Sequence, residues 1–68
     1  MRTLFKGFIK RWIHNKGYGF IETDDVDEDV FVHRSDVIGS NRLEEGREVR
    51  FDVQWTYKGL KAVYVKLM

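Results

Sequence analysis

Apolar and polar residues alternate along most of this chain, as expected for β-strands, whose successive side chains point to opposite faces. The clearest alternation spans residues 48–55. There, four apolar side chains share one face and four polar ones the other: Val49, Phe51, Val53 and Trp55 against Glu48, Arg50, Asp52 and Gln54. We therefore predict a strand at 48–55 whose apolar face, Trp55 included, packs in the core or at its rim.

The same pattern predicts four further strands, joined by polar turns. They span 3–13, 18–23, 29–33 and 60–67, and the last offers Val63, Val65 and Leu67 to the core. Gly7, inside the first strand, predicts a bulge, a bend or a close backbone approach. A single helical turn is expected at 34–38, with Ser35 as its cap. Five short strands without helical periodicity predict an all-β, five-stranded antiparallel barrel of the oligonucleotide-binding type.

The strands at 18–23 and 29–33 concentrate the aromatic residues. Alternation places four rings on one face and three aliphatic side chains on the other: Tyr18, Phe20, Phe31 and His33 against Ile21, Val30 and Val32. Turning the rings inward would bury an imidazole and a phenol that need partners, and would expose the aliphatic residues. We therefore predict a hairpin that carries its rings on the surface and its aliphatic residues in the core.

Length and composition narrow the class of protein. Sixty-eight residues allow one domain with a modest core. The chain has no cysteine, so neither a disulfide nor a thiolate metal site is available. We find no signal-peptide pattern and no run of about 20 apolar residues that would span a membrane. These features predict a soluble, cytoplasmic, single-domain protein.

Charge is distributed unevenly although the formal net charge is only +1. Residues 1–21 carry five basic side chains and no acid, whereas residues 22–29 carry six acids and no base. The basic residues therefore lie on the same strands as the predicted rings. Such a dipolar surface attracts and orients a polyanion despite a nearly neutral total.

The acidic run at 25–29 imitates the start of a calcium-binding loop. The sixth position of that loop requires glycine, but Val30 stands there and is needed as strand. His14 lies in a turn, and no nucleophile, base and orienting group occur at a convincing spacing. We therefore predict no metal site, no cofactor and no enzymatic activity.

Two motifs resemble a known family. Lys16-Gly17-Tyr18-Gly19-Phe20-Ile21 and Val30-Phe31-Val32-His33 are similar to the two ribonucleoprotein motifs of the cold-shock domain, in the same order and separation. Gly7, the segment 43–46 and the pair 58–59 also match. The resemblance covers the chain from Gly7 to Val65 and implies one cold-shock-like domain over residues 1–68. The family fold is a five-stranded barrel that binds single-stranded RNA or DNA, often as an RNA chaperone.

The resemblance also implies roles for individual residues. It assigns base stacking to the four rings and phosphate contacts to Lys10 and Lys16. The family usually has Trp-Phe in its first strand, so Arg11 takes the tryptophan position without a gap and Trp12 takes it after a one-residue shift. Arg34 stands where a phenylalanine normally follows the histidine. The candidate nucleic-acid-binding residues are Lys10, Arg11, Trp12, Lys16, Tyr18, Phe20, Phe31, His33 and Arg34.

These residues suit recognition of unpaired bases. Every base has a π-face, so rings on a rigid sheet bind single strands with little sequence demand. We predict single-stranded RNA or DNA as the partner, no membrane or small-molecule substrate, and a monomer. The alternative is a barrel that docks a partner polypeptide on its aromatic face. Arginine and aromatic residues are enriched in protein–protein interfaces as well. Trp55, Tyr57 and Tyr64 are assigned no part in the site.

Overall fold

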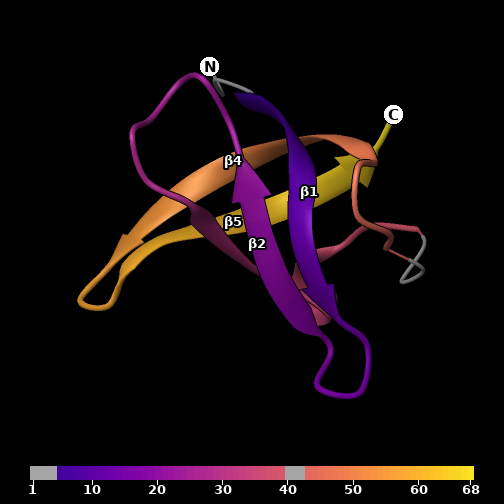
Figure 1. Ribbon diagram of the computed structural model, residues 1–68. Helices are drawn as coiled ribbons and strands as arrows, with labels where there is room; N and C mark the ends of the chain where they lie inside the picture. The colour runs from indigo at the N-terminus through magenta and orange to yellow at the C-terminus, as the bar shows by residue number, and fades with distance from the viewer. Residues whose placement is uncertain (1–4, 40–42) are drawn as a thin grey trace.

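The computed structural model describes residues 5–39 and 43–68 and consists of five strands and one short 3-10 turn (Figure 1). The strands are β1 (Phe5–Ile13), β2 (Tyr18–Glu22), β3 (Val30–His33), β4 (Glu48–Thr56) and β5 (Gly59–Leu67), and η1 (Arg34–Asp36) follows β3. All five predicted strands are confirmed to within two residues at the described ends, while Thr3 and Leu4 lie outside the described residues. Within 5–39 and 43–68, no helix is long and apolar enough to cross a membrane.

The strands close into a barrel in the order β1-β2-β3-β5-β4, which confirms the predicted architecture. Neighbours along the ring are antiparallel except at the seam between β3 and β5, where Phe31 pairs with Lys61 in parallel. One such pairing is unavoidable, because strand direction cannot alternate around a closed ring of five. The predicted antiparallel barrel is therefore refined at one place: the pairing of β3 with β5 is parallel.

The core lies inside the barrel and is built from the inward faces of the strands. Ile21, Val30 and Val32 are fully buried, whereas the four rings on the opposite faces of β2 and β3 are half-buried. The predicted facing of this hairpin is therefore confirmed. Phe51 of β4 is the largest side chain that is fully buried among the described residues.

A β-bulge in β5 overturns part of the predicted core. Arg50 pairs with Lys66 but Asp52 pairs with Val63, so two residues of β5 oppose one of β4. Tyr64, at the bulge, has a φ of 52°. The extra residue shifts the alternation, so that Leu60 and Ala62 are buried in place of Val63, which is only half-buried along with Leu67. Of the three residues predicted to face the core, Val65 alone is fully buried.

Two local predictions were also wrong. Trp55 is 75% exposed, and it lies near the end of β4, where the β4–β5 hairpin projects beyond the other strands (Figure 1). The cap of η1 is His33 rather than Ser35: the Ser35 backbone N–H donates to the His33 ring. Gly7 marks a close backbone approach, because a Cβ there would collide with the Glu22 carbonyl.

Candidate nucleic-acid interface

Four side chains of β2 and β3 form a continuous cluster of rings, which we call the ring cluster: Tyr18, Phe20, Phe31 and His33. Direct pairing across the hairpin sets Tyr18 opposite His33 and Phe20 opposite Phe31. The Phe31 ring lies 5.5 Å from that of Tyr18, tilted by 39°, and 6.0 Å from that of Phe20, edge to face at 71°. Phe31 is thus the centre of the cluster, and both contacts hold its ring in place.

His33 has a defined tautomer. Its Nδ1 accepts a hydrogen bond from the Ser35 N–H at 3.1 Å and lies 2.8 Å from Ser35 Oγ. A backbone N–H can only donate, so Nδ1 must be the unprotonated nitrogen and Nε2 carries the proton of the neutral ring. The side chain therefore joins the cluster as an oriented ring with one N–H donor, Nε2.

Arg11, and not Trp12, extends the ring cluster onto β1. A register shift between Ile9 and Arg11 makes Arg11 the partner of Phe20 on the outer face and Trp12 the partner of Gly19 on the inner face. Trp12 is 7% exposed and belongs to the core. The prediction that Trp12 contributes to the binding surface is therefore wrong, because the missing side chain of Gly19 provides the space that buries its indole.

The predicted basic residues are arranged around the cluster in different ways. Lys10 lies at the β1 irregularity, and its ammonium is 3.2 Å from an Asp29 carboxylate oxygen in an exposed ion pair. Lys16 is exposed in the β1–β2 turn. Arg34 donates its backbone N–H to the Gly17 carbonyl at 2.8 Å, and its side chain crosses Gly17 so closely that a Cβ there would lie 2.9 Å from Arg34 Cδ. Arg34 is thus fixed beside the turn that begins β2.

A groove of about 540 Å³ separates the ring cluster from the β4–β5 hairpin. Its lining comprises Phe20, Phe31, His33, Ser35 and the segment 56–61. The charged residues of this lining are both lysines, Lys58 and Lys61. Reasoning from the sequence assigned no role to Tyr57 or Lys58, because nothing in the local pattern indicates that their turn faces Phe31.

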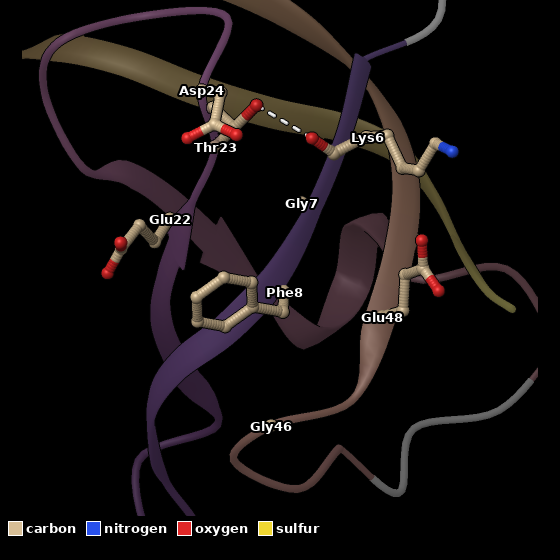
Figure 2. Close-up of a pocket in the computed structure, with 8 residues that line it drawn as sticks. All are labelled: Lys6, Gly7, Phe8, Glu22, Thr23, Asp24, Gly46 and Glu48. Carbon is tan, nitrogen blue, oxygen red and sulfur yellow. Dashed lines mark hydrogen bonds between the residues drawn. The ribbon is translucent and has the colours of Figure 1, made fainter.

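A second groove, of about 350 Å³, is lined by three carboxylates and one ammonium, that of Lys6 (Figure 2). Phe8 is 44% exposed there and pairs with Glu22 on one side and Glu48 on the other. Asp24 adds a third carboxylate, and Thr23 Oγ1 donates to the Lys6 carbonyl at 2.7 Å. Carboxylates on both sides of the exposed ring repel phosphate. This groove therefore marks an end of the surface that suits a polyanion.

The acidic β2–β3 loop does not assemble a metal site within the part of the chain that the structure describes. No three histidine, aspartate or glutamate side chains of residues 5–39 and 43–68 come together as metal ligands. Asp29 is held by Lys10, and Asp25 accepts a hydrogen bond from the Thr23 hydroxyl at 3.3 Å.

Comparison with protein families gives a match that spans all five strands and nearly the whole chain. Residues 5–68 match the model of the 'Cold-shock' DNA-binding domain. The chain belongs to the cold-shock domain family. Members of this family bind nucleic acid and are not enzymes, which is the class that the sequence predicts.

Cold shock-like proteins of several bacteria are similar to this chain over most of their length. The cold shock-like protein of Aquifex aeolicus is 41% identical over 66 residues, covering 94% of each chain. That of Thermotoga maritima is 43% identical over 65 residues, covering 93% of this chain and 97% of the relative. The cold shock-like protein CspC of Escherichia coli K12 is 44% identical over 62 residues, covering 88% and 90%.

A solved structure shares the fold. The drosophila Unr CSD456 structure superposes with a TM-score of 0.84 at 24% identity, over 98% of this chain and 27% of that one. At this level of identity the likeness concerns the cold-shock barrel itself. The five strands and their closure are therefore those of the family.

Proposed function

We propose that this cold-shock domain binds single-stranded RNA or DNA with little sequence preference by stacking unpaired bases on the ring cluster. The observation that carries the proposal is the position of Phe31. Its ring is half-buried on the surface, held by Tyr18 and Phe20, with the fully buried Val30 and Val32 beside it in the strand. A ring fixed in this way loses little conformational freedom when a base stacks on it.

The energetics favour unpaired bases. One base stacked on an aromatic side chain contributes about 1–3 kcal/mol, and the cluster offers several such positions. In a duplex the bases already stack on each other and face inward, so these contacts are not available. A protein that holds bases unpaired also opposes RNA secondary structure, and we therefore assign this domain the role of an RNA chaperone.

Cations around the cluster add the second part of the binding energy. Arg11 lies beside Phe20, and Arg34 lies beside the turn that leads into Tyr18. A guanidinium stacks on a base and neutralises phosphate at the same time. The Nε2–H of His33 supplies a donor for a base carbonyl or a phosphate oxygen. Binding is therefore expected to weaken as salt is raised.

The test compares one labelled oligonucleotide, unpaired and annealed to its complement. Fluorescence anisotropy at equal ionic strength should give at least tenfold tighter binding to the single strand. Equal affinities for the two forms would contradict base stacking. Absence of binding to either form would favour the alternative, a barrel that docks a polypeptide on its aromatic face.

A further inference from the structure

Tyr57 is the most exposed of the large apolar and aromatic side chains in the described part of the chain. It is 94% exposed at the tip of the β4–β5 hairpin, so its ring adds almost nothing to the core. The turn around it is nevertheless well defined. Thr56 Oγ1 donates to the Gly59 carbonyl at 2.8 Å and accepts from the Lys58 N–H at 3.1 Å. The ordered turn therefore holds the Tyr57 ring where a flat ligand can pack on it.

The groove beside this turn has two walls from different parts of the chain. Phe20, Phe31 and His33 line one wall, and the segment 56–61, with Tyr57, lines the other. Its volume of about 540 Å³ falls within the range of roughly 300–1,000 Å³ that is usual for small-molecule sites. The two walls are joined where Phe31 pairs with Lys61 across the barrel seam. The groove therefore forms where closure of the barrel brings β3 beside β5.

The charge of its lining distinguishes this groove from three other grooves of the described residues. Its charged lining residues are Lys58 and Lys61. The Lys61 ammonium is 3.4 Å from an Asp36 carboxylate oxygen in an ion pair. The positive charge at the groove therefore comes mainly from Lys58, whose ammonium lies 5.8 Å from the centre of the Tyr57 ring. The grooves beside Phe8, Ile38 and Val26 all include carboxylates. Flat apolar walls combined with positive charge fit a flat ligand that carries a phosphate.

We propose that this groove is a two-walled nucleotide pocket, in which a base stacked on Phe31 is covered on its other face by Tyr57. The proposal rests on the function proposed above and adds a pocket to the open ring surface. A base on a single ring leaves its second face in water, whereas a base between two rings is desolvated on both. Lys58 follows Tyr57 in the same turn, and in this pocket its ammonium pairs with the phosphate of the bound nucleotide.

Substitution of Tyr57 tests the pocket, with anisotropy of a labelled oligothymidylate as the readout. Tyr57→Ala should weaken binding by about 5- to 150-fold, equivalent to one base stack of about 1–3 kcal/mol. Tyr57→Phe, which keeps the ring, should bind like the wild type. Tyr64→Ala is the matched control, since Tyr64 is also exposed but lines the separate groove beside Ile38, and it should leave affinity unchanged. Equal losses for Tyr57→Ala and Tyr64→Ala would contradict a specific pocket.

A double-mutant cycle tests whether Tyr57 and Phe31 share one base. If they do, Phe31→Ala/Tyr57→Ala should lose less affinity than the product of the two single losses, because the second substitution acts on a base already released. Strictly multiplicative losses would overturn the shared pocket. If Phe31→Ala weakens binding and Tyr57→Ala does not, the pocket fails while the proposed function stands. If Phe31→Ala has no effect, the proposed function itself fails.

Discussion

Trp12 packs against Gly19, its partner across β1 and β2, so closely that a Cβ on Gly19 would lie 2.8 Å from Trp12 Cε3. This contact decides which face of β1 each neighbour takes. With the indole buried over a strand position that lacks a side chain, Arg11 must point outward, where it pairs with Phe20. The composition of the candidate nucleic-acid interface therefore depends on a packing contact in the core.

The first prediction concerns that contact. Gly19→Ala should lower the free energy of unfolding by about 1–3 kcal/mol, because the methyl group must displace the Trp12 ring or the Arg11 backbone. Chemical denaturation followed by circular dichroism measures the change. A variant as stable as the wild type would show that the indole has space to move, and that Arg11 is not fixed by this packing.

A second prediction tests the facing of β3 with two neighbouring residues. Phe31→Ala should weaken single-strand binding by about 1–3 kcal/mol with the barrel still folded. Val32→Ala, which is fully buried, should instead reduce stability by about 0.5–2 kcal/mol and leave the affinity of the folded protein unchanged. Denaturation and anisotropy on both variants separate the two effects. The reverse pattern would mean that the rings form the core.

Period-two alternation predicted the strands and the facing of β2 and β3 correctly. It succeeded there because the inward-facing residues of both strands, Ile21, Val30 and Val32, all lie inside the barrel and are fully buried. The same pattern in β4 continues through Trp55, yet Trp55 is exposed. Alternation reports only the side on which a residue points, and it contains no information on where the barrel ends.

Irregularities in pairing account for the other errors. The bulge at Tyr64 changes which residues of β5 face the core. The register shift before Arg11 determines which residue of the pair Arg11–Trp12 is buried. Both depend on the neighbouring strand, so the sequence left the choice between Arg11 and Trp12 open. The groove beside Tyr57 is equally inaccessible to a local pattern, since it exists only because the barrel closes between β3 and β5.

The ion pair between Lys10 and Asp29 leads to a third prediction. Asp29→Asn should tighten single-strand binding at low salt by about 1.5- to 5-fold, because it frees an ammonium held by an exposed pair worth about 0.2–1 kcal/mol. Asp27→Asn removes the same charge from the same loop and should have a smaller effect. Anisotropy titrations of the two variants at several salt concentrations make the comparison. Identical gains would indicate a general charge effect with no part for Lys10.

The fourth prediction concerns Arg34. Each phosphate neutralised on a single strand contributes about −0.7 to the slope of log affinity against log salt. Arg34→Phe should reduce the magnitude of that slope by up to about 0.7 and cost little affinity at high salt, since a ring replaces a guanidinium. Arg34→Ala should bind more weakly at every salt concentration.

Arg50 provides the control for this measurement, because its neighbours across the strands are Lys6 and Lys66 rather than the rings. Arg50→Ala should leave the slope as it is in the wild type. If the wild type, Arg34→Phe and Arg34→Ala all share one slope, Arg34 does not contact phosphate and the interface ends at His33.

The most direct test of the central claim, that unpaired bases stack on the ring cluster, is an NMR titration of the aromatic ring protons with a short pyrimidine-rich single strand. Phe8 is an internal control, because its exposed ring lies among carboxylates at the other groove. We predict that the ring signals of Tyr18, Phe20, Phe31 and His33 shift in proportion to the bound fraction while those of Phe8 stay in place. Shifts at Phe8 without shifts at the ring cluster would contradict the account.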